Sequence, residues 1–280
     1  MTQTEVRETI DPVELEIDGV WDQLVAEASV QERSPSLRSL MNLRVTSRSC
    51  FEDSLATAMA QAASDGHTYE APLHDMFFDV LQRNPDIGRA ARIDLVASVE
   101  RNPAYPNLLI PYLFAKGFLG LEMHRVGHAL WHEGRSTEAF MIQSRISEVF
   151  SMDIHPAARV GTGVFIDHAT GIVIGETAVV GDDSSLLQGV TLGGTGKETG
   201  DRHPKVGRGC LISAGAIVLG NVQVGDYSRI GAGSVVLSDV PPHSTVVGVP
   251  AKVVRTNRPS DCPGETMDPR IEDMMPEYVI

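Results

Sequence analysis

Aliphatic residues recur at every sixth position through the second half of this chain, in two runs. The first run is Ile154, Val160, Ile166, Ile174, Val180 and Leu186, and the second is Val206, Ile212, Val218, Val224, Ile230 and Val236. A six-residue period is typical of a parallel β-helix, in which three hexads close one triangular coil. The aliphatic side chains point inward and stack from coil to coil, because no coil can bury its apolar face alone. The pattern therefore predicts a solenoid.

The six-residue period also indicates where the solenoid departs from regularity. The register slips by two residues near 171–173. It fails altogether between Leu192 and Val206, where the segment LGGTGKETGDRHPK is rich in glycine and charge and cannot stack. We expect this segment to protrude as a loop.

The rest of the chain has a different character. From about Asp18 to Met152 the apolar residues follow a helical period, which predicts a compact bundle. Residues 255–280 are polar and rich in proline, which predicts a flexible tail. The fold class is therefore α+β, with a helical domain at 1–152 (1–11 disordered), a β-helix at 153–254 and a tail at 255–280.

Bulk composition narrows the function classes. The formal net charge of −14 disfavours nucleic acid and anionic membranes as partners, because phosphate binding needs a basic face. No apolar stretch is long enough to span a bilayer, and the N-terminus lacks the pattern of a signal peptide. The 3 cysteines are widely spaced and odd in number, as in reduced proteins. We expect a cytoplasmic protein without a membrane anchor.

Three clusters of polar residues on or beside the predicted solenoid could carry chemistry: Asp153 with His155, Asp167 with His168, and Arg202 with His203. Asp153 and His168 lie within one coil of about 18 residues, so we expect them to meet on adjacent coils. A carboxylate that orients an imidazole makes a general base suited to neutral pH. The alternative is that these histidines only cap turns of the solenoid.

Two other patterns are weaker. His124, His128 and His132 share one helix face with spacing that could hold zinc, but a polar helix face fits equally well, and we expect no metal. The segment around Lys197 resembles a phosphate-binding loop, yet Thr191 and Glu198 replace residues that such a loop requires. We keep only the prediction that Lys197 and nearby backbone N–H groups contact an anionic ligand.

The segments DIHPAARVGTGVFIDHATG, VTLGGTGKETGDRHPKVGRG and IGAGSVVLSDVPPHSTVVGVPAKVV resemble serine O-acetyltransferases. RNPAYPNLLIPYLFAKGFLGLEMHRVGHALWHEGR is similar to the end of that family's helical domain. The resemblance implies a left-handed β-helix and transfer of acetyl from acetyl-CoA to the hydroxyl of L-serine, the first step of cysteine biosynthesis. It implies trimers that pair into hexamers, with active sites between neighbouring solenoids, and feedback inhibition by L-cysteine.

The resemblance also implies roles for single residues. His168 matches the general base and Asp153 its orienting partner, Asp167 falls at a serine-binding position, and Arg202 and His203 match the loop residues that hold the substrate carboxylate and complete the site. Positions where the family's backbone meets the pantetheine arm of CoA are Gly194, Ala214 and Ala232. The C-terminal Ile280 matches the residue that the family inserts into O-acetylserine sulfhydrylase, the next enzyme.

One position departs from the family pattern. The family usually has Arg-Asp-Pro-Ala where this chain has Arg101-Asn102-Pro103-Ala104. That aspartate helps to bind the amino group of serine or cysteine, so Asn102 predicts weaker binding of both.

Three other functions remain alternatives at this point: a hexapeptide acetyltransferase acting on another hydroxyl or amino acceptor, a metal-dependent β-helix of the carbonic-anhydrase type, and a non-catalytic regulator that binds the sulfhydrylase through its tail.

Overall fold

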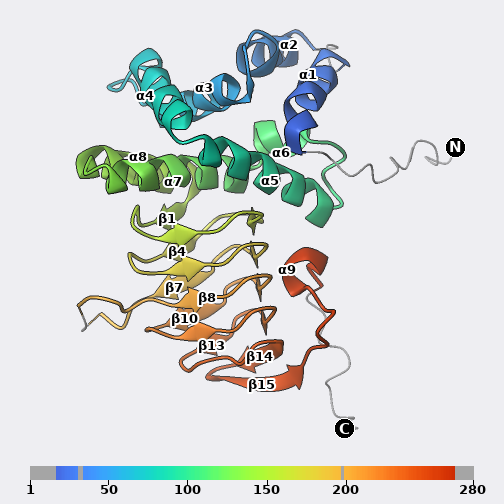
Figure 1. The fold of residues 1–280 in the computed structure, drawn as a ribbon, viewed down its shortest axis with the longest axis vertical. Coiled ribbons are helices and arrows are strands. Elements are labelled where there is room, and N and C mark those ends of the chain that lie inside the picture. Colours follow the sequence, from blue (N-terminus) through green and yellow to red (C-terminus); the bar gives the residue numbers. More distant parts are fainter. Residues whose placement is uncertain (1–16, 31–33, 197–198, 269–280) are drawn as a thin grey trace, which may run out of the picture.

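The computed structural model describes residues 17–30, 34–196 and 199–268, and it stacks a helical layer on one end of a β-helix (Figure 1). In the described residues, a 3-10 turn at Ile17–Gly19 and a π-helical turn at Asn42–Thr46 accompany eight α-helices before the first strand. These are α1 (Val20–Val30), α2 (Pro35–Met41), α3 (Phe51–Ala63), α4 (Glu70–Arg83), α5 (Pro85–Arg101), α6 (Leu109–Phe114), α7 (Lys116–His132) and α8 (Ser136–Phe150).

The helices bury one apolar side each, as their sequence period predicts. Phe51 and Leu55 of α3 are fully buried beside Tyr112 of α6, and Tyr112 and Phe51 lie 6.0 Å apart between ring centroids. A short turn through Gly134 connects α7 to α8, and both helices lie directly above the first coil of the β-helix (Figure 1). Among the described residues, no helix has the length and apolar content needed to cross a membrane.

The β-helix is built from short strands in three sheets. The first sheet has the order β1 (Met152–Ile154), β4 (Ile172–Ile174), β7 (Thr191–Gly193), β10 (Ile217–Leu219) and β13 (Val235–Val236). The second contains β2 (Arg159–Val160), β5 (Val179–Val180), β8 (Lys205–Val206) and β11 (Gln223–Val224). The third contains β3 (Phe165–Ile166), β6 (Ser185–Leu186), β9 (Leu211–Ile212), β12 (Arg229–Ile230), β14 (Ser244–Gly248) and β15 (Ala251–Thr256).

The strand register confirms the hexad analysis. Asp153 of β1 pairs with Val173 of β4, twenty residues on, whereas Val173 pairs with Thr191 of β7, eighteen residues on. The first coil thus carries the two extra residues that the slip near 171–173 predicted. The interruption after β7 forms the loop that protrudes from the solenoid (Figure 1).

A buried charge cluster joins the helical layer to the β-helix. Arg125 of α7 binds Asp94 of α5, with 2.5 Å between Nη2 and Oδ2, and also donates to the backbone carbonyls of Val160 and Gly161. Asp94 in turn accepts a hydrogen bond from the backbone N–H of Val164 at 2.7 Å. Because both side chains are removed from water, these paired contacts fix how the helices sit on the first coil.

The expectation of a flexible tail from residue 255 onward is wrong for residues 255–268. β15 continues to Thr256, and α9 (Pro263–Thr266) packs against the solenoid below α5, with Pro263 and Gly264 buried (Figure 1). The polar composition did not predict this packing because the contacts are made largely by backbone groups. Residues 1–16 and 269–280 lie outside the described residues.

Candidate active site

His168 lies in the turn between β3 and β4, where the third sheet passes into the first. Its φ is 58° and that of Ala169 is 59°, so two successive non-glycine residues are left-handed, a strained conformation that is typical of functional sites. The turn is held by hydrogen bonds from Gly171 N–H to Ser151 O (2.8 Å) and from Gly189 N–H to Thr170 O (2.9 Å). The His168 side chain is 67% exposed, so its imidazole is accessible to a substrate.

The carboxylate beside this imidazole is Asp167 and not Asp153. Asp167 Oδ2 lies 3.3 Å from His168 Nε2, whereas Asp153 Oδ1 accepts a hydrogen bond of 2.6 Å from Gln143 of α8. Among the described residues, Asp153 and His168 share no hydrogen bond or ion pair. Within this chain the two side chains lie apart because Asp153 faces outward from the middle of β1, while His168 lies at the corner between β3 and β4 that closes the same coil. Their pairing stays a prediction.

Residues from the helical domain surround the His168 turn. Asn102 Nδ2 donates to Asp167 Oδ1 at 3.4 Å, and the Lys116 ammonium group donates to the Thr170 hydroxyl. A cavity of about 350 Å³ opens between Tyr105, Lys116 and His168. Burial, and secondarily the charge of Asp167, raises the pKa of Tyr105. The turn therefore gathers a base, a carboxylate, an amide and an ammonium group, of which the base His168 and the ammonium group of Lys116 line the cavity.

His203 belongs to a second cluster, at the corner where the first sheet passes into the second. Its Nδ1 accepts a hydrogen bond from Thr177 N–H at 3.2 Å and lies 2.9 Å from the Thr177 hydroxyl. A backbone N–H can only donate, so Nδ1 carries no proton, and the neutral ring holds its proton on Nε2. Burial lowers the pKa of His203, which favours this neutral form. The side chain of His203 is therefore a fixed N–H donor at Nε2.

The orientation of His203 is set by close packing. A Cβ at Gly175 would lie 2.1 Å from His203 Nε2, and one at Gly194 would lie 3.2 Å from the same atom. Next to it, Arg202 Nη2 binds Glu176 Oε2 at 2.8 Å, and this hydrogen bond lowers the pKa of Glu176. The second cluster thus presents a guanidinium and an imidazole N–H side by side.

The two clusters occupy opposite edges of the first sheet, by which we mean the two ends of its strands. His168 lies in the turn that enters β4, whereas Arg202 and His203 lie in the segment that leaves β7. Ala214 and Ala232 occupy the same corner of the solenoid as His168 on later coils, and Gly233 N–H donates to Ala214 O at 2.9 Å. Gly194 lies next to His203 at the other corner. One chain brings Asn102, Asp167 and His168 together, and brings Gly194, Arg202 and His203 together, but does not join the two sets. Lys197 and Ile280 lie outside the described residues.

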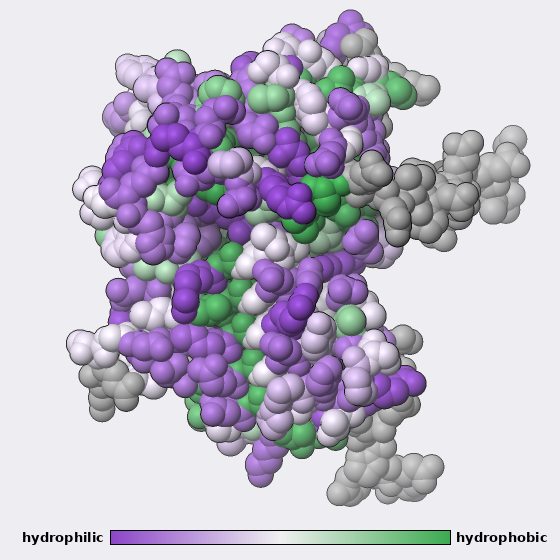
Figure 2. Space-filling view, in the orientation of Figure 1, coloured by the Kyte–Doolittle hydropathy of each residue, from purple (hydrophilic) through white to green (hydrophobic). Residues whose placement is uncertain are grey.

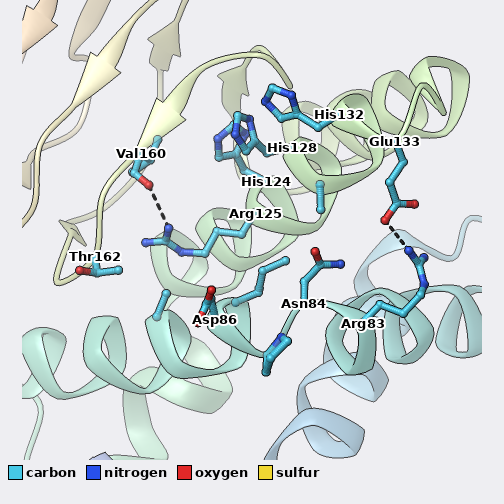
Figure 3. A pocket seen from close by; sticks show the side chains of 14 residues that line it. Arg83, Asn84, Asp86, His124, Arg125, His128, His132, Glu133, Val160 and Thr162 are labelled. Atoms are coloured by element: carbon cyan, nitrogen blue, oxygen red, sulfur yellow. Dashed lines mark hydrogen bonds and ion pairs between the residues drawn. The ribbon is translucent and has the colours of Figure 1, made fainter.

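The histidine row of α7 lines a different space. His124, His128 and His132 border a cavity of about 570 Å³ between α5, α7 and the first coil, together with Arg125 and Arg83 (Figure 3). His128 Nδ1 donates to Pro156 O at 2.7 Å, and burial lowers the pKa of His124 to about 3. Within the described ranges, no group of three or more histidine, cysteine or acidic side chains is arranged to hold a metal ion.

His155 fits the turn-capping alternative. Its Nδ1 accepts the N–H of Ala157 at 3.1 Å, and its ring packs edge-on against Trp131 and Phe140. Sequence reasoning missed Lys116, Tyr105 and Thr177, which complete the two clusters. Thr177 had a usable signal, because it occupies the bend one coil before His203; Lys116 and Tyr105 had none, since only the packing of the helical domain brings them to the turn.

Comparison with known proteins gives one consistent answer. Residues 20–123 match the family described as serine acetyltransferase, N-terminal, and residues 203–238 match the bacterial transferase hexapeptide (six repeats) family. Serine acetyltransferase from Escherichia coli (strain K12) is 43% identical, over 90% of this chain and 93% of its own length.

Solved structures agree in fold and sequence. Soybean serine acetyltransferase complexed with serine is 46% identical with a TM-score of 0.83, covering 86% of this chain and 100% of that one. A serine acetyltransferase complex with cysteine has a TM-score of 0.88 at 41% identity, covering 91% and 99% of the two chains. The enzyme from Brucella abortus strain S19 in complex with coenzyme A has a TM-score of 0.84 at 44% identity, covering 86% and 97%. The chain belongs to the serine acetyltransferase family.

Proposed function

We propose that this protein transfers acetyl from acetyl-CoA to the hydroxyl of L-serine, giving O-acetyl-L-serine and CoA, in the first step of cysteine biosynthesis. The observation that carries the proposal is the exposed His168 imidazole on its strained turn, flanked by Asp167 and Asn102. The family membership of the chain and the complexes of its solved relatives with serine and coenzyme A support the choice of substrates.

In the proposed reaction, His168 takes the proton of the serine hydroxyl while the serine oxygen attacks the thioester carbonyl. The tetrahedral intermediate collapses with cleavage of the carbon–sulfur bond, and His168 returns the proton to the departing thiolate. A carboxylate at hydrogen-bond distance stabilises the imidazolium that forms between the two steps. Asp167 holds that place in this structure, and Asp153, the partner that the family pattern implies, accepts a hydrogen bond from Gln143 instead.

Substrate binding divides between the two clusters. We assign the amino group of serine to Asp167 and Asn102, and its carboxylate to Arg202 and the Nε2–H of His203, because the first pair offers acceptors and the second offers donors. His203 completes the catalytic site by this contact. Since the clusters lie on opposite edges of the first sheet, we infer that each complete site joins His168 of one chain to His203 of its neighbour.

The surface of the solenoid is suited to such a neighbour. A hydrophobic band runs down the solenoid face that carries the first sheet (Figure 2), and Val173 and Leu237 are exposed outward from this region of the chain. We propose that copies pack there as a trimer, and that trimers pair through their helical domains. Contiguous apolar surface of this kind marks protein contacts in soluble proteins.

Acetyl-CoA would lie along the corner below His168, with its pantetheine arm against the backbone at Ala214 and Ala232 and at Gly194 and Lys197 of the neighbour. L-cysteine, which differs from serine by one atom, would compete for the same groups and inhibit; a relative has been solved with cysteine bound. We place the reaction in the cytoplasm, without nucleic acid, membrane or metal as partner.

The test is a thiol-release assay with acetyl-CoA and L-serine, L-homoserine or no acceptor. Release should require L-serine, and His168→Ala should lower kcat at least 100-fold while acetyl-CoA still binds, since general-base catalysis contributes about 10²–10⁴-fold. Near-normal turnover by the variant, or equal release with no acceptor, would contradict the proposal.

A second function is proposed for the C-terminus. A free carboxylate on an apolar Ile280 imitates an amino-acid substrate, so we propose that it enters the active site of O-acetylserine sulfhydrylase. Deleting Ile280 should abolish co-elution with the sulfhydrylase and leave acetyl transfer unchanged; a variant that still forms the complex would exclude this role.

A further inference from the structure

The segment after β15 runs back along the solenoid towards the helical domain, and residues 257–267 are here termed the strap. Asn257 begins it, with its N–H donating to His243 O at 2.6 Å and its side chain to Tyr227 O at 3.4 Å. Gly264 N–H then donates to Gly209 O at 2.9 Å, and α9 lies against α5 (Figure 1). The strap therefore spans from the lower coils to the underside of α5.

Gly264 fits its place with no room for a side chain. A Cβ there would lie 2.3 Å from Asp183 O and 2.9 Å from the carbonyl carbon of Gly209. These are backbone atoms of the solenoid, which cannot move aside as a flexible side chain would. The strap docks in this position only because residue 264 is glycine.

The docked strap is connected to α5 through one hydroxyl group. Ser185 of β6 is fully buried, and its Oγ donates to Gly264 O at 2.5 Å. The same Oγ accepts from Arg101 Nη1 at 3.1 Å. Because the hydroxyl has one proton and gives it to Gly264, its lone pairs face Arg101. Loss of the strap would expose this hydroxyl to water, and its lone pairs would then no longer be held towards Arg101.

Arg101 is the last residue of α5 and is only 9% exposed. Its Nη1 also donates to Ser184 O at 3.3 Å, and the charges of Asp183 and of Glu265 in the strap act on it without forming an ion pair among the described residues. A buried guanidinium without a paired anion keeps its position only while its hydrogen bonds persist. The next residue is Asn102, which donates to Asp167 beside His168.

We propose that Arg101 is a positioning residue, held by the docked strap through Ser185, that places Asn102 at the serine site. The inference rests on the proposed function, since it assigns Asn102 to the binding of serine. It assigns the strap a task distinct from that of Ile280: the strap sets the affinity for serine from the far side of the third sheet.

The decisive variant is Gly264→Ala in the full-length chain. The strap should leave its place, which cleavage by endoproteinase Glu-C after Glu265 would report as a faster cut. The KM for L-serine should rise about fivefold, the loss of one ordinary hydrogen bond of ~1 kcal/mol, while kcat and the KM for acetyl-CoA stay within about twofold. Thr266→Ala, on the exposed side of α9, is the matched control and should leave all three constants unchanged.

Ser185→Ala tests the relay independently of the strap. It should raise the serine KM by a similar factor, and the Gly264→Ala, Ser185→Ala double variant should be no worse than either single one, because both break one connection. Faster cleavage with an unchanged serine KM would overturn the inference, as would additive effects or equal losses in every kinetic constant. Failure of the proposed function is distinguishable, because the unmodified protein would then release no thiol with serine.

Discussion

The side chain at position 102, here Asn102, determines the charge of the proposed serine site. Its amide donates to Asp167, so this chain presents one carboxylate to the substrate ammonium group, where an aspartate would make two. A hydrogen bond assisted by charge contributes about 1.5–3 kcal/mol against about 1 kcal/mol for a neutral one. Part of that gain would be offset, because two carboxylates this close repel each other.

Asn102→Asp should therefore lower the KM for serine and the inhibition constant for cysteine, each by about 3- to 10-fold. Both constants are measured in the thiol-release assay, with cysteine as competitor. Equal inhibition constants for the two proteins would remove Asn102 from the set of affinity determinants.

Gly175 sets the position of His203. A Cβ at this residue would lie 2.0 Å from His203 Cδ2, so Gly175→Ala must push the imidazole out of its contact with Thr177. We expect kcat/KM for serine to fall about 10- to 100-fold, since a displacement of about 1 Å can cost that much. Gly19→Ala is a suitable control, because a Cβ there meets no atom within 4 Å. Full activity of the Gly175→Ala protein would exclude His203 from the site.

At the scale of the element, the joint between α7 and the solenoid contains a buried acid that shares its ionic partner: Glu122 Oε2 lies 3.4 Å from Arg125 Nε, and Arg125 also binds Asp94. Glu122 is fully buried next to Asp94 and Arg125, and burial, followed by the charge of Asp94, raises its pKa well above the usual value. Because the folded pKa exceeds the unfolded one, the folded state binds more protons between the two. The contribution of Glu122 to the free energy of unfolding is then fully present below about pH 4 and is lost as pH rises from there towards the folded pKa.

Glu122→Gln should weaken this pH dependence, because an amide of the same shape needs no proton, while Asp94, whose pKa burial also raises, still contributes. We expect the variant to have the higher Tm at pH 7–8, and the difference to shrink as pH falls towards 4. Each pH unit between the two pKa values is equivalent to about 1.4 kcal/mol. Thermal unfolding at four pH values measures it, and parallel Tm curves would show that Glu122 is not the group that titrates.

The six-residue period predicted the solenoid and its register slip, because every inward position repeats one local rule. Ile154, Val180 and Ile230 are all nearly or fully buried where the period places them. The same rule does not place side chains that face outward. Asp153 and Gln143 come together because α8 lies over β1, and no local pattern encodes that contact. Likewise, Gly264 docks against Gly209 through backbone groups, which leave no trace in composition.

The candidate site was predictable to a similar degree. The motif residues Asp167, His168, Arg202 and His203 were identified from sequence, and their division between two edges of the first sheet follows from strand order. The partner of His168 and the proton position on His203 required coordinates, because both depend on single hydrogen bonds.

For the whole molecule, each chain carries the base half of one proposed site and the donor half of another. In the proposed trimer that arrangement would close a heterologous ring, in which every interface joins the base half of one copy to the donor half of the next. Two proteins that are each inactive, His168→Ala and His203→Ala, should then rescue each other when they are unfolded and refolded together. In a random trimer about a quarter of the interfaces would combine an intact imidazole from each parent, so the mixture should regain about a quarter of normal activity.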